Sequence, residues 1–262
     1  MTGKHSSWRA SVDFGRTAAD YSRHRAGYPE EMFSRLGALG IGLPGQRLLD
    51  MATGTGYLGR GFARRGARVT GLDRSDELLG EARRLDAEAG IESDYVLGQA
   101  EQSGLADAAF EAVSVGQAWH RFERPRAAAE ARRLLVAGGA LAIAHFDWLP
   151  LPGSVVEASE TLIQAHNPEW PWGGRNGFHA YQAADLGAAG FGALESFSFD
   201  LDVAYSAEAW RGRIRASAGI GATLPPDRVE AFDKAHAALL AERFGDDLIA
   251  PHRAFAMIGR AP

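Results

Sequence analysis

Residues 48–56 read LLDMATGTG, and residues 69–73 read VTGLD. Each stretch is a short apolar run of the kind that forms a buried strand. The first run ends in a glycine turn, and the second ends in an acid, Asp73. In a parallel sheet both ends border one crevice, where a nucleoside and its charged tail can lie. The two stretches therefore predict an α/β fold with a nucleoside site.

The glycine turn leaves room for a ligand against the backbone. Gly54 and Gly56 have no side chain, so the chain can turn sharply and adopt a positive φ. A helix is expected over residues 57–65, with Gly66 just past its end. The next strand, 67–72, delivers Asp73 17 residues after Gly56. At that position a carboxylate can accept both hydroxyls of a ribose.

Two cofactor classes fit this turn. Residues 54–59 (GTGYLG) match the G-x-G-x-x-G pattern of dinucleotide-binding proteins. Asp50 lies inside the preceding strand end, where its negative charge would repel a pyrophosphate. S-adenosylmethionine carries a sulfonium and an ammonium, so Asp50 favours it over NAD. Ordinary turn chemistry and helix capping are the competing interpretations of each feature taken singly.

The composition excludes several classes of protein. The 262 residues fit one large domain or a domain with an insertion. The chain has no cysteine, which excludes thiolate–zinc sites and a cysteine nucleophile and favours a cytoplasmic location; no metal is expected. The net charge of −5 disfavours nucleic acid as a partner. No run approaches the about 20 apolar residues that span a bilayer, so no membrane contact is expected.

Strands and helices alternate through the first 146 residues. Strands are expected at 67–72, 94–97, 110–115 and 140–146, and helices at 57–65, 76–89 and 125–135. This alternation predicts a doubly wound, parallel sheet with its ligand at the carboxyl ends of the strands. Further on, helices are expected at 155–164 and 181–189, and strands at 193–199 and 254–260, the last one antiparallel.

The residues at these strand ends resemble a known family, the class I S-adenosylmethionine-dependent methyltransferases. The similarity is to the small-molecule type related to the ubiquinone-biosynthesis and trans-aconitate methyltransferases. Residues 49–56 (LDMATGTG) resemble the family's cofactor loop, with Ala52 where glycine is commoner. Residues 98–101 (GQAE) resemble the segment that touches adenine, with Gln99 in place of the usual Asp. The amide oxygen of Gln99 can still accept a hydrogen bond from the adenine amino group.

The resemblance implies a Rossmann-like, mostly parallel, seven-stranded sheet with an antiparallel last strand and with helical and aromatic cap insertions. It also implies S-adenosyl-L-methionine as the cofactor. The residues that it places around the cofactor are Tyr21, Arg25, Asp50, Ala52, Thr53, Gly54, Gly56, Asp73, Arg74, Gln99, Ala100, Glu101 and Gln117.

Three regions of the chain follow from this resemblance. Residues 1–36 are expected as an N-terminal lid, in which Arg25 meets the methionine carboxylate; a solvated basic helix is the competing interpretation. Residues 37–147 are the cofactor-binding core. Residues 148–262 complete the sheet and carry cap insertions at 148–180 and 201–251.

The cap is expected to hold the acceptor. An apolar cavity for a small hydrophobic or aromatic molecule is predicted from its tryptophans and from one in the core: Trp119, Trp148, Trp170, Trp172 and Trp210. The competing interpretation is that tryptophans fill the cap's own core. Arg211 and Arg215, which share a helix side, could clamp a carboxylate or form a solvated face.

Methyl transfer from a sulfonium is an in-line displacement, so a general base is needed only when the acceptor must lose a proton. His120 and His145, each after a strand, are the candidates, because imidazole titrates near neutrality. The predicted activity is methyl transfer to a small organic acceptor at oxygen, with nitrogen and carbon as the alternative atoms, by a monomer or homodimer. An NAD-dependent oxidoreductase and a non-catalytic nucleoside-binding regulator are the alternatives.

Overall fold

The computed structural model describes His24 and residues 27–262. Tyr21, Arg25 and most of the expected lid therefore lie outside the described residues. The described chain divides into two compact units. The sheet unit comprises residues 27–146, 178–199 and 254–262, and the helical unit comprises His24 and residues 147–177 and 200–253.

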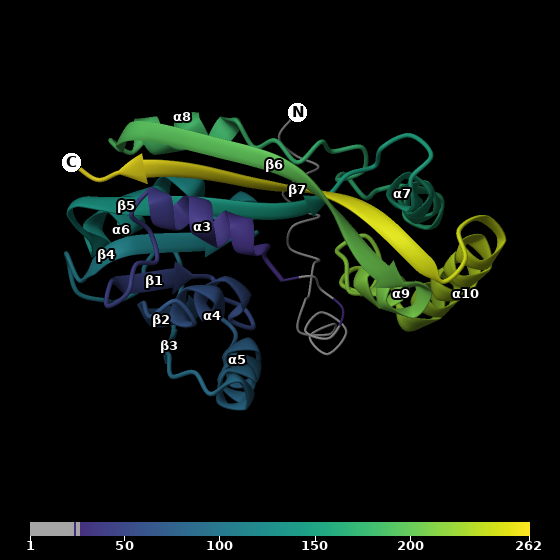
Figure 1. Ribbon diagram of the computed structural model, residues 1–262, viewed down its shortest axis with the longest axis horizontal. Coiled ribbons are helices and arrows are strands. Elements are labelled where there is room, and N and C mark those ends of the chain that lie inside the picture. Colours follow the sequence, from purple (N-terminus) through teal and green to yellow (C-terminus); the bar gives the residue numbers. More distant parts are fainter. Residues whose placement is uncertain (1–23, 25–26) are drawn as a thin grey trace. The chain divides into compact units, whose positions relative to one another are not determined.

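Seven strands form one sheet in the order β3-β2-β1-β4-β5-β7-β6 (Figure 1). Their bounds are β1 Arg47–Met51, β2 Arg68–Asp73, β3 Asp94–Leu97, β4 Phe110–Gly116, β5 Leu135–Trp148, β6 Gly192–Ser206 and β7 Asp247–Arg260. Strands β1 to β5 pair in parallel. Beyond the end of β7, Ala261 exchanges hydrogen bonds with Gly138 and Gly139 of β5, as expected for antiparallel neighbours. The predicted mostly parallel sheet with an antiparallel last strand is confirmed.

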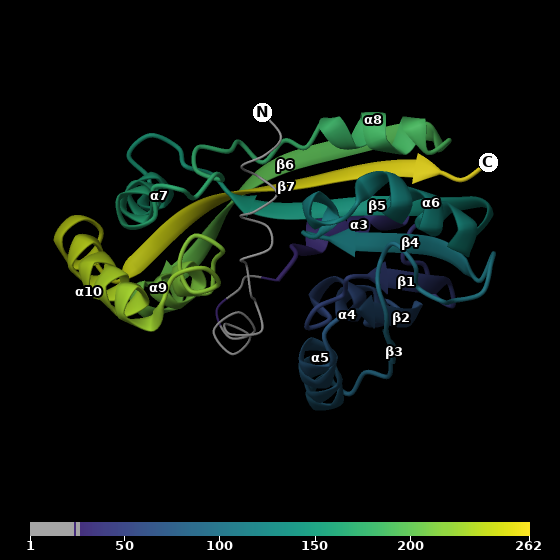
Figure 2. The same ribbon diagram turned by 180° about the vertical axis from the view of Figure 1, so that it is seen from behind.

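Helices cover both faces of the sheet unit. They are α3 Glu30–Ala38, α4 Tyr57–Ala63, α5 Asp76–Ala89, α6 Arg124–Leu134 and α8 Tyr181–Ala188. Figures 1 and 2 show α3 and α4 on one face and α6 and α8 on the other, which is the doubly wound arrangement. The sequence sets the ends of α5 locally: Ser75 accepts a hydrogen bond from the Leu78 amide, and Gly90 ends the helix with φ +64°.

The core of the sheet unit lies where these helices pack on the strands. Because parallel strands are covered on both faces, they are continuous apolar runs rather than alternating ones. Leu48, Leu49 and Met51 of β1 are fully buried, as are Leu141 and Ile143 of β5. The strand order reverses between β1 and β4. In open α/β sheets ligands bind at that point, beyond the carboxyl ends of the strands.

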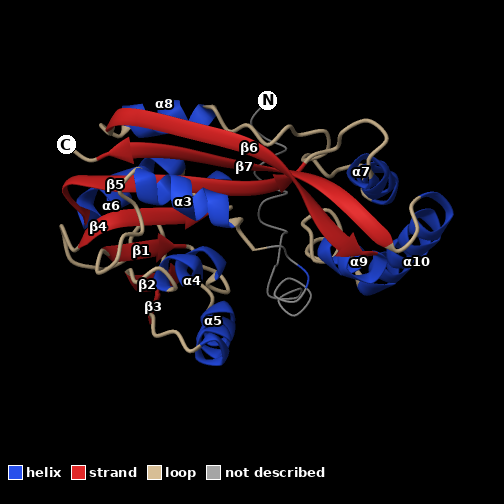
Figure 3. Cartoon of the chain, viewed as in Figure 1, coloured by secondary structure: helices blue, strands red, loops and turns tan. Residues whose placement is uncertain are grey.

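The helical unit has its own core. Its helices are α7 Val155–His166, α9 Ala207–Arg215 and α10 Pro226–Arg243 (Figure 3). Trp210, Phe232 and Ile163 are fully buried among them. Among the described residues, no helix combines the length and the apolar character needed to cross a bilayer.

Three strands are longer than the sequence predicted. β5 begins at Leu135, β6 continues to Ser206, and β7 begins at Asp247. The insertion expected as helical over residues 201–251 is thus strand at both ends, which corrects that expectation. Alternating apolar residues such as Leu201, Val203 and Tyr205 have the period of two that suits a strand.

Candidate cofactor site and active site

The carboxylate of Asp50, at the end of β1, is buried, and both of its oxygens accept hydrogen bonds. Its Oδ2 accepts hydrogen bonds from Thr53 Oγ1 at 2.7 Å and from the Gly59 amide at 3.0 Å, and its Oδ1 accepts one from Ser114 Oγ at 2.7 Å. Burial raises the pKa of Asp50 to about 6, although these hydrogen bonds act to lower it. The structure therefore gives Asp50 a role in holding the turn between β1 and α4, and its contact with a methionine tail stays a prediction.

Asp73, at the end of β2, is tied to the same turn. Its Oδ2 accepts a hydrogen bond from the Gly54 amide at 2.9 Å, and its Oδ1 accepts one from the Ser75 amide at 3.0 Å. Each ionised carboxylate oxygen has further lone pairs, so Asp73 can accept additional hydrogen bonds from a ligand. The negative charge of Asp73 also raises the pKa of Asp50 slightly, which indicates that the two carboxylates lie near each other.

Residues 52–56, called here the cofactor loop, have an unusual backbone. Gly54 and Gly56 adopt φ of +58° and +79°, which glycine tolerates without cost. Ala52 adopts φ +57°, where a side chain causes strain. This strain gives a physical reason why glycine would suit that position better than alanine. Gln117, at the end of β4, also has a positive φ and donates a hydrogen bond from Nε2 to the Phe146 carbonyl at 2.6 Å.

The segment after β3 is held by α6 and its N-cap. Glu101 accepts a hydrogen bond from the Glu123 amide at 2.9 Å, and Ala100 is buried. The side chain of Gln99 is exposed and is free of core packing, while its backbone bridges to Gln102. Arg74 is exposed beside Asp73. The structure thus brings Asp50, Asp73 and the cofactor loop into direct contact, and the adenine contacts of residues 99–101 stay a prediction.

His120 lies in a short 3-10 helix, Trp119–Arg121, directly after β4, and its ring is half-buried. Its neighbour Trp119 is fully buried in the core of the sheet unit. The indole of Trp119 donates a hydrogen bond to Asp185 of α8 at 3.0 Å. These contacts of Trp119 are core packing, so its contact with an acceptor stays a prediction.

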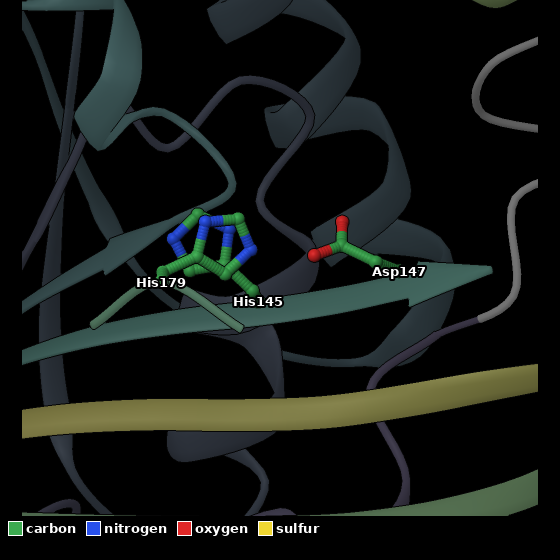
Figure 4. Close-up of side chains that lie close together, drawn as sticks. All are labelled: His145, Asp147 and His179. Atoms are coloured by element: carbon green, nitrogen blue, oxygen red, sulfur yellow. The ribbon is translucent and has the colours of Figure 1, made fainter. Parts of the chain in front are cut away.

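His145 lies near the end of β5 and is 1 % exposed. Its ring stacks on His179, with centroids 3.6 Å apart and an interplanar angle of 15° (Figure 4). The amide Nε2 of Gln182, on α8, donates a hydrogen bond to Nε2 of His145 at 2.7 Å.

The same stack bears on metal binding. Asp147 follows His145 by two residues on β5 and so shares its face of the strand, and with His179 they offer three candidate ligand atoms of two types, imidazole nitrogen and carboxylate oxygen (Figure 4). Imidazole binds a metal through a lone pair in its ring plane, at about 2.0–2.1 Å for zinc. The nearly parallel planes of His145 and His179 do not meet at a common ion. This geometry does not suit a metal held by both rings.

The tryptophans of the helical unit differ in exposure. Trp170 and Trp210 are buried in its core, and the Trp210 indole donates to Ser159 Oγ at 2.9 Å. Trp148 and Trp172 are half-buried. The guanidinium of Arg213 lies 4.6 Å from the ring centre of Trp148, and that of Arg175 lies 4.0 Å from the ring centre of Trp172. Trp148 and Trp172 are therefore partly exposed, with a guanidinium over each ring, and their contact with an acceptor stays a prediction.

Arg211 and Arg215 do share one side of α9, as their spacing indicated. Both guanidinium groups pair with Asp233 of α10, at 2.5 and 2.9 Å, and both reach Glu208. Asp233 thus has two cationic partners, which lower its pKa against the opposing effect of burial. This pairing joins α9 to α10, and it engages the two arginines that were considered as a carboxylate clamp.

Sequence reasoning missed several residues of the site. The sequence predicts Ser114 only as part of a buried strand, and it does not indicate Gln182 or the buried pair of Arg60 with Asp86. A serine in the middle of an apolar strand is a signal that singles out Ser114, but its pairing with Asp50 comes from the register of β1 and β4. For Gln182, Arg60 and Asp86 the sequence gives no comparable signal.

Comparison with known proteins shows that this chain is similar to methyltransferases. Residues 49–143 match the family model described as "Methyltransferase domain". An uncharacterized methyltransferase of Mycobacterium tuberculosis is 30 % identical over 179 residues, covering 61 % of this chain and 70 % of the relative. A ubiquinone/menaquinone biosynthesis C-methyltransferase of Paracoccus denitrificans is 40 % identical, covering 41 % and 45 %. A ubiquinone biosynthesis O-methyltransferase of Azoarcus is 35 % identical, covering 38 % and 44 %.

Solved structures share the fold. A candidate type II methyltransferase from Anaeromyxobacter dehalogenans is 22 % identical, with a TM-score of 0.64, and the match covers 90 % of this chain and 98 % of that one. Phosphoethanolamine N-methyltransferase 2 of Haemonchus contortus, in complex with phosphomonomethylethanolamine and S-adenosylhomocysteine, is 16 % identical, with a TM-score of 0.57 and coverage of 95 % and 57 %.

The strand order, the glycine turn and the acid at the end of β2 define a class I methyltransferase, and the chain belongs to the methyltransferase family. It is an S-adenosylmethionine-dependent methyltransferase, as its resemblance implied. The alternatives of an oxidoreductase and of a non-catalytic regulator are set aside by this membership.

Proposed function

We propose that the cofactor loop and Asp73 hold S-adenosylmethionine at the switch point between β1 and β4. The observation that carries this assignment is the hydrogen bond from the Gly54 amide to Asp73, because it joins the two motifs whose spacing indicated a nucleoside. A carboxylate oriented by two backbone amides is preorganised to accept the ribose hydroxyls. In this proposal, residues 99–101 and Gln117 line the same site, and Tyr21 and Arg25 close over it.

We further propose that the acceptor is a small, hydrophobic or aromatic molecule that is methylated at oxygen. The partly exposed rings of Trp148 and Trp172 support an aromatic acceptor, which would stack on the ring surface that Arg213 and Arg175 leave uncovered. A histidine after β4 supports oxygen, because a hydroxyl must lose its proton as it attacks whereas a neutral amine already offers a lone pair. The named relatives include both C- and O-methyltransferases, so they do not select the atom.

The roles of the side chains follow from this proposal. When bound, S-adenosylmethionine supplies a methyl group on a positively charged sulfur. His120 would take the proton of the acceptor hydroxyl, and the cofactor, held by the cofactor loop and Asp73, would supply the methyl group that the oxygen accepts. His120 is preferred over His145, since His145 is buried against His179 and Gln182. Most of the rate comes from holding the reacting atoms close and aligned.

The experiment is a screen for turnover. The protein is incubated with S-adenosylmethionine, whose transferable methyl is isotope-labelled, and with matched sets of phenols, catechols, anilines and carboxylic acids. Formation of S-adenosylhomocysteine is measured, and NMR identifies the atom that carries the label. Turnover of a phenol or catechol with the label on oxygen is expected. Turnover confined to amines, or a label on carbon, would overturn the oxygen assignment.

We also propose that the protein acts in the cytoplasm, as a monomer or homodimer, on free small molecules.

A further inference from the structure

A buried ion pair lies beneath the cofactor loop. Arg60 Nε, on α4, donates a hydrogen bond to Asp86 Oδ1, on α5, at 2.6 Å, and the two side chains are 8 % and 4 % exposed. Removing two charges from water is costly, so a buried ion pair is weak evidence of a gain in stability. A different benefit is needed to explain why this pair is buried next to a ligand-binding turn.

The other polar atoms of this pair connect it to the loop and to β3. Arg60 also donates to the backbone carbonyl of Thr55 at 2.9 Å and to that of Ala82 at 3.2 Å. Asp86 accepts a second hydrogen bond from the hydroxyl of Tyr95 at 2.7 Å. Arg60 thus binds a carbonyl of the cofactor loop. The hydroxyl of Tyr95 holds the carboxylate of Asp86, which in turn binds the guanidinium of Arg60. We call these three residues the support of the loop.

The support also touches the loop at Gly56. A Cβ atom added to Gly56 would lie 2.9 Å from a guanidinium nitrogen of Arg60 and 2.9 Å from the hydroxyl of Tyr95. Gly56 has φ +79° and begins α4 as its N-cap. Backbone and support are therefore packed so closely that a shift of Arg60 or Tyr95 moves the loop or leaves a gap beneath it.

We propose that Arg60, Asp86 and Tyr95 are positioning residues that fix the cofactor loop in its binding form before the cofactor arrives. This inference rests on the proposed cofactor site. Ordering a loop in advance reduces the free energy lost on binding, so the support contributes to affinity without touching the cofactor. Its chemical basis is the guanidinium fork, which serves Asp86, Thr55 and Ala82 at once.

The test uses three variants of the support, all in the full chain. Tyr95→Phe removes one hydroxyl, Asp86→Asn removes the charge, and Arg60→Lys keeps the charge but not the fork. Hydrogen–deuterium exchange of residues 52–59 is measured without cofactor, and S-adenosylhomocysteine affinity is measured by calorimetry. Faster exchange is expected in all three, with affinity weakened about threefold in Tyr95→Phe and about tenfold or more in the others, the scale of one lost hydrogen bond or a lost charged one.

The control is Leu134→Ala in α6, a fully buried residue of the same unit. It should destabilise the protein by leaving a cavity in the core, without changing exchange in the cofactor loop or the affinity. If the support variants change loop exchange no more than Leu134→Ala does, the inference is wrong. If Asp86→Asn does not fold, Tyr95→Phe decides. If the wild-type protein does not bind S-adenosylhomocysteine, the proposed cofactor site fails, whereas loop exchange in the free protein still tests the support.

Discussion

Ser114 on β4 donates a hydrogen bond to Asp50 on β1, across 2.7 Å between two residues paired in the parallel register. The bond joins the strands on either side of the switch point, where the strand order reverses. It helps to hold the carboxylate of Asp50 in a site with 1 % exposure, together with Thr53 and the Gly59 amide. The buried charge of Asp50 has a cost that depends on pH.

We expect Asp50 to make the protein less stable as the pH rises through its titration. Its pKa is about 6 in the folded state, against an ordinary value of 3.8, so between these values the folded state binds more protons than the unfolded state. The free energy of unfolding therefore falls as pH rises from 4 to 6, by the order of 2–3 kcal/mol from this group. Urea unfolding of wild type and Asp50→Asn at a series of pH values measures the difference. A difference that does not vary with pH would contradict the prediction.

Asp73→Ala should weaken cofactor binding. The carboxylate that accepts the Gly54 amide is proposed to accept the ribose hydroxyls as well, so its loss should cost about 1.5–3 kcal/mol of binding free energy. Calorimetric titration with S-adenosylhomocysteine measures this. Asp76→Ala, the same substitution at an exposed acid three residues away, is the matched control and should leave affinity unchanged. Equal affinities for the two variants would remove Asp73 from the cofactor site.

Ala52→Gly should stabilise the protein. A φ of +57° strains any residue with a Cβ, by about 1–2 kcal/mol. Glycine relieves this strain but adds freedom to the unfolded chain, which offsets about 0.4–1 kcal/mol. A net gain of about 0.5–1 kcal/mol is expected in chemical unfolding. Ala87→Gly, at an exposed position within α5, should instead cost about 1 kcal/mol, since glycine disfavours a helix. A loss of stability in Ala52→Gly would show that the positive φ carries no strain.

His236 on α10 should make the helical unit sensitive to acid. It is fully buried, and its Nε2 contacts Ser159 Oγ at 2.9 Å. Burial lowers the pKa of His236 to about 4. The negative charge of Asp233 acts to raise this pKa, and the positive charges of Arg211 and Arg215 act to lower it. Between pH 6.5 and 4 the unfolded state binds more protons, so stability falls as the pH falls, by about 2–3 kcal/mol.

Tryptophan fluorescence during urea unfolding at pH 7.5 and pH 4.5 follows this effect, because the Trp210 indole bonds to the same serine. His236→Gln can still bond to Ser159 but does not titrate. Its stability should therefore depend less on pH than that of the wild type. If both proteins lose the same stability on acidification, His236 is not the responsible group.

His120→Ala tests the proposed general base. If His120 removes the acceptor's proton, turnover should fall by about a hundredfold or more, while cofactor affinity hardly changes. The loss should shrink at high pH, where the acceptor ionises without help. Steady-state rates over a pH series measure this, with the acceptor found by the screen. A variant with a rate loss that is constant across pH would assign a packing role to His120 and move the question to His145.

The sequence by itself determined the features that depend on local chemistry. The spacing of apolar residues and the positions of capping residues and glycines predicted α4, α5 and the strands around them, because these features act over a few residues. The motif at residues 48–56 and the acid at Asp73 likewise predicted a class of cofactor, since their spacing along one β-α-β unit fixes where they meet. The family and the mostly parallel sheet followed from these and are confirmed.

Only the tertiary structure decided which distant side chains meet. Asp50 and Ser114 are 64 residues apart and touch because β1 lies next to β4, a neighbour that chain order does not give. Arg60 meets Asp86 because the rotations of α4 and α5 on the sheet turn both inward. Packing within each unit likewise buried Trp119, after β4, and Trp210, on α9, although a tryptophan suits a core and a ligand pocket equally well. Sequence spacing sets which residues share an element, whereas packing between elements sets what each side chain contacts.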